Sequence, residues 1–133
     1  MAGSLPVALG LCVCDYVIVE EKTRKASAIG MFSGMGLEHL PGRALPFSVF
    51  AALSDGLGVV TIRLVITRLD TGAQIFSREN QVNFMDKLTE VYFHFRVRTC
   101  VFPAAGWYEA VLLANGEWLA HRRFRVYPVG GVS

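Results

Sequence analysis

The chain has 133 residues, of which 53% are hydrophobic and only 18% are charged. Its 13 basic and 11 acidic residues are scattered and give a net charge of +2, which excludes a basic footprint for nucleic acid. Mean hydropathy is +0.41, yet no apolar run approaches the ~18 residues of a membrane-spanning helix. We therefore predict one domain over residues 1–133, with neither a nucleic-acid nor a membrane partner, whose surplus apolar surface meets another protein.

The first residues, Met1–Cys14, are apolar but lack the other marks of an export signal. No Lys or Arg precedes the apolar run, and no small-x-small cleavage site follows it. Leu11 also stands before Cys12, where a lipoprotein signal needs Gly or Ala. We expect the protein to be cytoplasmic.

The three cysteines, Cys12, Cys14 and Cys100, do not form a familiar motif. Their number is odd, they contain no Cys-x-x-Cys, and no histidine lies near them. We predict three reduced, buried thiols, with no disulfide, no metal and no cofactor.

The first predicted strand, Leu9–Val19, is apolar on both faces, as in a central strand. Asp15 interrupts it and is interpreted as a carboxylate that caps a strand end or loop, with a functional acid as the alternative. Glu20–Lys25 forms a charged hairpin turn. The chain then returns as a short strand, Ala26–Phe32, with Gly30 at a close approach or bulge.

Ser33–Pro46 is the longest stretch predicted to be irregular, because glycines and prolines punctuate it. It is expected to cross from one sheet to the other, and a loop of this length is where a site would lie. His39 and Arg43 are its candidates. Nothing pairs them with a second catalytic group, so we expect solvated loop residues.

Four strands follow, and their side-chain patterns differ. Val59–Arg68 alternates most clearly between apolar and other side chains, as a half-buried strand does. Ala73–Val82 is polar and is predicted to be a solvated edge strand. Phe47–Leu53 is apolar, and Thr89–Val97 places its phenylalanines inward. Thr89–Val97 leaves His94 alone on the solvent face, and His94 is therefore not expected to be half of a metal site.

The last predicted element is a β-hairpin, Gly106–Val126. Asn115-Gly116 is the dipeptide that best tolerates the two positive φ values of a type I′ turn. A regular register from this turn pairs Leu112 with Leu119 and Glu109 with Arg122.

That register leaves Phe124 and Val126 on the face opposite the core. A β-bulge near His121–Arg123 would return both side chains to the core, and we predict this bulge. The alternative is a second buried face on the hairpin, covered by another subunit.

Together these elements predict an all-β, immunoglobulin-like antiparallel β-sandwich of about eight strands. No segment shows a convincing helical period. The predicted core contains Val13, Ile29, Phe47, Ile62, Leu64, Phe93, Phe95, Tyr108 and Leu112.

Several short segments occur in the same order in a known family. They are Cys14-Asp15-Tyr16, Ser27–Phe32, Thr71-Gly72, and Gly106-x-Tyr108 followed by Asn115-Gly116-Glu117. Over roughly Leu9 to Val126 the chain resembles a bacterial family of small proteins described only as a domain of unknown function. The resemblance implies a compact β-sandwich in a bacterial cytoplasm, and it supplies no activity, cofactor or catalytic residue.

No nucleophile with a base, carboxylate pair or metal-ligand spacing is recognisable, so an enzyme is not expected. We predict a protein-interaction or self-assembling structural module, with a small-ligand-, carbohydrate- or peptide-binding sandwich as the alternative. Its partner is expected to be a second copy of itself in a homodimer or larger homo-oligomer, or else another protein. The predicted interface is the outer face of the last hairpin, which carries Trp107, Val111, Leu113, Trp118 and Arg122.

Overall fold

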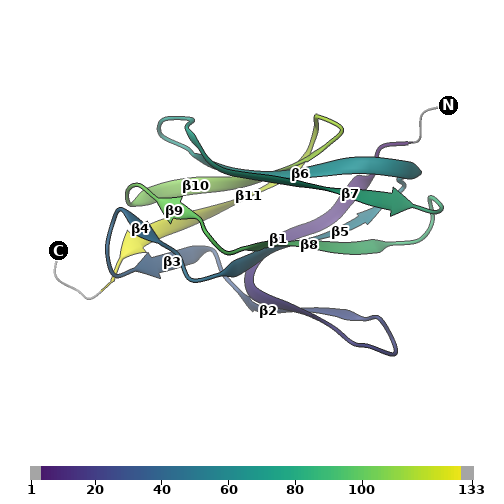
Figure 1. Ribbon diagram of the computed structural model, residues 1–133, viewed down its shortest axis with the longest axis horizontal. Helices are drawn as coiled ribbons and strands as arrows, with labels where there is room; N and C mark the ends of the chain where they lie inside the picture. The colour runs from purple at the N-terminus through teal and green to yellow at the C-terminus, as the bar shows by residue number, and fades with distance from the viewer. Residues whose placement is uncertain (1–3, 130–133) are drawn as a thin grey trace.

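The computed structural model describes residues 4–129, and these form eleven strands and no helix (Figure 1). The all-β prediction is confirmed. The strands are β1 Val7–Val19, β2 Ala26–Met31, β3 Gly34–Leu37, β4 Gly42–Arg43, β5 Phe47–Ser54, β6 Gly58–Arg68, β7 Gln74–Phe84, β8 Val91–Val97, β9 Val101–Phe102, β10 Gly106–Ala114 and β11 Glu117–Pro128. The three strands beyond the predicted eight are the short β3, β4 and β9.

Two sheets pack face to face and make the fold sandwich-like (Figure 1). One has the order β2-β1-β5-β8, the other has the order β3-β11-β10-β6-β7, and β4 pairs with β9 beside them. All pairs are antiparallel except β3 with β11, which is parallel. Edge position explains the polar sequence of β7, and the prediction of an edge strand there is confirmed.

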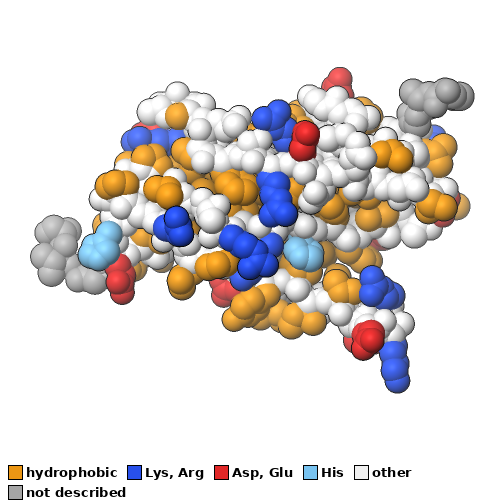
Figure 2. All heavy atoms as spheres, viewed as in Figure 1, with side chains coloured by type: hydrophobic (Ala, Val, Ile, Leu, Met, Phe, Trp, Pro, Cys, Tyr) orange, Lys and Arg blue, Asp and Glu red, His pale blue; other side chains and the backbone are white. Residues whose placement is uncertain are grey.

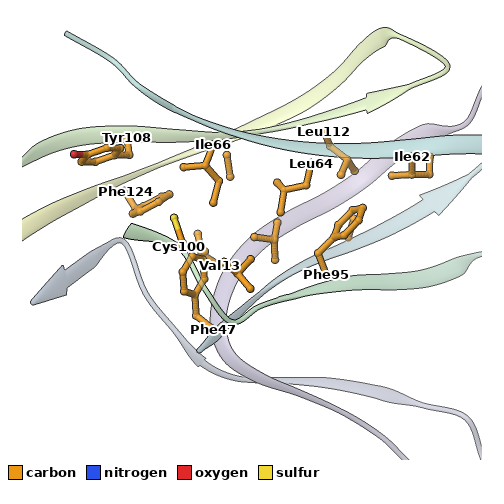
Figure 3. Packing of buried hydrophobic residues seen from close by; sticks show 14 of the residues in the cluster. Val13, Phe47, Ile62, Leu64, Ile66, Phe95, Cys100, Tyr108, Leu112 and Phe124 are labelled. Atoms are coloured by element: carbon orange, nitrogen blue, oxygen red, sulfur yellow. The ribbon is translucent and has the colours of Figure 1, made fainter. Parts of the chain in front are cut away.

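The core lies between the two sheets, where the inward positions of alternating strands meet (Figure 3). Along β6, Val60, Ile62, Leu64 and Ile66 are at most 2% exposed, which confirms the predicted alternation. Of the predicted core residues, Ile29 is wrong, because it lies on an edge strand and is 41% exposed. Phe93 packs against the core but is only partly buried.

Tyr108 fixes the start of β10. Its hydroxyl donates a hydrogen bond to the Ala104 carbonyl at 2.7 Å, while its ring lies in the core 4.9 Å from Phe102. A tyrosine bonded to backbone a few residues upstream is a feature of immunoglobulin-type sandwiches. The immunoglobulin-like assignment itself stays a prediction.

The last hairpin turns where the sequence predicts, since Asn115 and Gly116 have φ values of 47° and 84°. Its bulge exists but lies nearer the turn than predicted. Leu113 pairs with Trp118, whereas Leu112 pairs with Ala120, so Leu119 is the extra residue. Phe124 and Val126 therefore return to the core and are fully buried.

The prediction of an irregular Ser33–Pro46 is partly wrong. The segment contains β3 and β4, and it leaves the four-stranded sheet, pairs with β11 in the other sheet and then returns to β5. The predicted crossing from one sheet to the other is therefore also wrong as a net path, because β2 before the segment and β5 after it belong to the same four-stranded sheet. The strands were missed because β3 is short and glycine-rich, and its partner lies far along the chain.

Residues 4–129 contain no helix that is long and apolar enough to cross a membrane. A cytoplasmic location stays a prediction. So does the single domain over residues 1–133, of which residues 1–3 and 130–133 lie outside the described residues.

Candidate functional site

A two-stranded ribbon projects from the edge of the four-stranded sheet, at the lower right in Figure 1. Strand β5 pairs with β1 only as far as Cys14, which lies opposite Ser48. Beyond that point, among the described strands, β1 pairs with β2 alone. We call residues 15–31 the arm. The middle of the arm is apolar and its tip, Glu20–Lys25, is charged. Two-stranded hairpins are marginally stable without packing against other structure.

Large apolar side chains continue from the arm across the outside of the four-stranded sheet. Tyr16 lies directly opposite Ile29, and the ring of Phe50 stacks on that of Tyr92 at 6.2 Å. We call the following six residues the outer apolar face: Tyr16, Ile18, Ile29, Met31, Phe50 and Tyr92. Phe50 is half-buried, and the other five are between 41% and 61% exposed. Figure 2 shows hydrophobic side chains gathered along this side, with charged side chains at the tip of the arm.

Arg96 lies across the middle of this face and is held by the sheet. Its Nη1 donates hydrogen bonds to the Asp15 carbonyl and to Ser48 Oγ, the second at 3.1 Å. Its guanidinium also lies 5.7 Å from the centre of the Tyr16 ring. Because these contacts occupy the cation, the face around it remains suited to apolar partners. His94 is exposed nearby, as predicted.

The cysteines lie beneath this face and in the core, and all three are free thiols. Burial raises the pKa of Cys14 to about 11 and that of Cys100 to about 12, and it also raises the pKa of the half-buried Cys12. Thiols with raised pKa values are protonated at neutral pH and are poor nucleophiles. Within residues 4–129, no three His, Cys, Asp or Glu side chains gather as metal ligands would.

A groove of about 810 Å³ opens at the base of the arm. Its apolar wall includes Met31, Phe32, Met35 and Leu45, and its polar lining includes Asp15, Glu38, His39 and Arg43. His39 and Arg43 are both exposed, in agreement with the prediction of solvated residues. The structure thus brings these two loop candidates to the wall of the same groove as Asp15.

Asp15 lies over Gly30 rather than capping a loop. A Cβ atom on residue 30 would collide with Asp15 Oδ2, and Gly30 has a φ of 70° that disfavours other residues. The predicted close approach at Gly30 is confirmed. Among residues 4–129, the Asp15 carboxylate has no hydrogen-bond or ion-pair partner.

The predicted interface on the last hairpin is only partly assembled. Trp107 and Trp118 are 50% and 56% exposed on the outer face of the five-stranded sheet. The half-buried Val111 lies between them in the register, and the half-buried Leu113 lies opposite Trp118. Arg122 does not belong there. It pairs with the buried Ala110 and so lies on the inner side of its sheet, because the bulge shifts the register by one residue.

The predicted cross-strand pair of Glu109 with Arg122 is therefore wrong, and Glu109 pairs with Arg123 instead. Arg123 Nε lies 3.3 Å from Glu109 Oε2, and His121 Nε2 lies 3.9 Å from the same oxygen. These polar groups stand between the two tryptophans in the register. Polar groups thus divide the hairpin face, as Arg96 and His94 divide the outer apolar face.

Sequence reasoning missed the outer apolar face, although one signal for it was present. Both faces of the first strand are apolar, and this pattern predicts burial of both faces within the domain. The outward residues of that strand, Tyr16 and Ile18, are instead 55% and 54% exposed. Apolarity on the second face indicates a cover, and it does not say whether that cover comes from the same chain.

Comparisons with known proteins bear on the fold and leave the activity open. Residues 9–127 match the Family of unknown function (DUF6941). A search of the curated proteins finds no match. Among solved structures, Pseudomonas fluorescens alkylpurine DNA glycosylase AlkC, bound to DNA containing an abasic site analog, matches with a TM-score of 0.55 at 12% identity. The match covers 92% of this chain and only 30% of that one, and it supports a shared fold alone.

Proposed function

Since the chain belongs to the Family of unknown function (DUF6941), we propose its role from geometry: a non-enzymatic self-association module whose outer apolar face binds a second copy. The resemblance to a domain of unknown function is thereby confirmed, while the bacterial origin stays a prediction. Another protein that presents a similar apolar face is the other possible partner.

The observation that carries this proposal is the exposure of the outer apolar face. In a sandwich the outer side of each sheet ordinarily carries polar residues, because only the inner side packs. Here Tyr16, Ile18, Ile29, Met31 and Tyr92 are exposed together on one side of one sheet. Large exposed apolar patches mark interaction surfaces in soluble proteins.

The size of the face suits a dimer. With a rise of about 3.3 Å per residue and a strand spacing of about 4.8 Å, the whole outer side of the four strands, including Arg96 and His94, covers roughly 500 Å² in projection. Two such faces would bury on the order of 1,000 Å², the lower limit for a specific interface. Packing two identical faces about a two-fold axis is the commonest symmetric arrangement.

The polar groups of the described chain support a non-enzymatic role. The histidines lie apart, with His39 at the groove, His94 on the outer side of β8 and His121 beside Glu109. The thiols are held protonated by burial. A nucleophile with an adjacent base, the usual basis of covalent catalysis, is therefore not assembled among residues 4–129.

The test is the solution mass by light scattering at tens of micromolar. We expect a dimer or larger species for the wild type and a shift toward monomer for Ile29→Glu, because the variant places a charge in the interface. Trp118→Asp is the control, since it places a charge at an apolar residue of the other sheet that is also exposed, 56% against 41% for Ile29. We expect it to keep the wild-type mass, and both variants should retain a β-type circular dichroism spectrum.

The outcomes separate the two faces. Loss of association in Trp118→Asp but not in Ile29→Glu would move the interface to the last hairpin. A wild type that is monomeric at tens of micromolar would overturn self-association through either face.

A further inference from the structure

The free edge of β2 carries neither of the commonest protections of edge strands, charge and proline, and Gly30, with a φ of 70°, is its one residue with a positive φ. Natural edges carry charges or prolines, or are very short, because unpaired N–H and C=O groups invite another strand. Strand β7, an edge of the other sheet, carries Arg78 and Glu79. Strand β2 has six residues, Ala-Ser-Ala-Ile-Gly-Met, with no charge and no proline, and it pairs on one side only. Its edge is therefore open to an added strand.

Gly30 leaves a gap in this edge that leads to a carboxylate. Gly30 follows Ile29 on β2, and the Asp15 side chain extends over it from β1. Because residue 30 has no side chain, a group arriving from outside β2 can reach Asp15 without obstruction. The Asp15 carboxylate is exposed and is without an ion-pair partner in the described chain, so it is available to a cation.

The groove adds a second contact beside the same residues. Asp15, Gly30 and Met31 all line it, and its wall continues through Phe32, Met35 and Leu45. A volume of about 810 Å³ is within the range of ligand pockets, and methionine-lined walls adapt to different apolar side chains. A segment that follows β2 would thus meet an acidic position and then an apolar hollow.

We propose that the free edge of β2 binds an extended segment of a partner protein as an added strand. A Lys or Arg of that segment reaches Asp15 across Gly30, and a neighbouring apolar side chain enters the groove. Main-chain hydrogen bonds to the edge supply affinity, and the two side-chain contacts supply specificity, as in other strand-addition complexes. This site uses the edge and inner side of β2 and shares only Met31 with the outer apolar face, so it does not depend on self-association through that face.

The dimensions agree with this recognition. An added strand lies two strand spacings from β1, about 9.6 Å. A long basic side chain and an aspartate together bridge such a distance when the intervening position is glycine. A shorter or acidic residue opposite Gly30 would leave the carboxylate unpaired or repel it.

The probe is a displayed library of random octapeptides, selected on the full chain. We expect enrichment of β-branched or aromatic peptides with one Lys or Arg at a fixed position and an apolar residue near it. For the best peptide, fluorescence anisotropy should show about fivefold weaker binding to Asp15→Asn than to wild type, an exposed-pair effect. Replacing the peptide's basic residue by Met should cause a similar loss, and the two changes together should lose little more than either alone.

Two controls separate this site from the rest of the molecule. Trp118→Asp, on the other sheet, should bind the peptide as wild type does, and thermal melting should show that Asp15→Asn remains folded. Failure to enrich any peptide, enrichment without a basic residue, or equal binding to wild type and Asp15→Asn would overturn the proposal. So would a fall of the solution mass to monomer on saturation with peptide, because that result would assign the edge to a second copy. A monomeric wild type would remove the self-association proposal and leave this one standing.

Discussion

Tyr108 connects a surface loop to the core through a single hydroxyl group. Tyr108→Phe removes the donor to the Ala104 carbonyl, and the buried ring otherwise keeps its place. We expect a loss of about 1 kcal/mol in the free energy of unfolding, measured by urea titration. Tyr92→Phe is the control, since the Tyr92 hydroxyl bonds Glu90 at the surface, and it should change stability by less than about half as much. Equal effects would contradict a special role for the Tyr108 bond.

Cys100 should make the protein sensitive to alkali. Its thiol is 1% exposed, and burial raises its pKa from 9.0 to about 12. Above pH 9 the unfolded chain loses this proton while the folded chain retains it, so stability falls as pH rises toward 12. The slope should be about 1.4 kcal/mol per pH unit for this thiol.

Unfolding free energies of wild type and Cys100→Ala between pH 8 and pH 11 check this expectation. The variant should be less stable at pH 8, because it leaves a small cavity, but its stability should decline less steeply. Parallel curves for the two proteins would contradict the assignment.

The bulge in β11 determines on which face of the sheet the later residues of the strand lie. One residue between Trp118 and Phe124 is surplus to the regular register. Deleting His121 should therefore heal the bulge, keep Phe124 in the core and cost less than about 1 kcal/mol. Deleting Ala120 and His121 together should turn Phe124 outward and cost more than about 3 kcal/mol, because a one-residue slip exchanges the two faces. Thermal unfolding of both variants tests the difference.

How far each element could be predicted depended on where its partner lies. Val59–Arg68 was predicted correctly because alternation along a strand reports directly which side chains face the core. Strand β3 could not be found in the same way, since its four residues gain their place only by pairing with β11. The existence of the bulge was predicted, but its position was not. The apolar pattern shows that the side chains change faces somewhere along the strand, and it does not show at which residue the change occurs.

The candidate site was harder to predict than the core for a related reason. The pattern of the first strand indicated apolar faces correctly, but Ile29 was assigned to the wrong environment. Sequence pattern reports that a side chain avoids water, and it does not identify the molecule that covers it. The sequence identified His39, Arg43 and Asp15 as candidates one by one. It could not show that they line one groove, because the path of the chain between the two sheets brings them together.

For the whole molecule, the arm and the sandwich should be separable. No residue from 15 to 31 belongs to the buried core cluster. Since Tyr16 lies opposite Ile29, replacing residues 17–28 by Asn-Gly should close a tight hairpin at that pair. We expect the free energy of unfolding to change by less than about 1 kcal/mol while self-association is lost.

Light scattering and urea titration of the shortened chain measure both properties. A shortened chain that fails to fold would show that the arm stabilises the sandwich itself. A shortened chain that still associates would assign the interface to another surface.

The position of β11 has a consequence for the time course of synthesis. This strand is made after every other described strand, yet it lies inside its sheet, between β3 and β10. Strand β3 precedes its partner by roughly ninety residues, so at translation rates of about 5–20 residues per second it waits roughly 5 to 20 s. During that interval the inner face of the unfinished sheet is open to solvent. A nascent chain of this protein should therefore be a substrate for chaperones until Phe124 and Val126 emerge and the sheet closes.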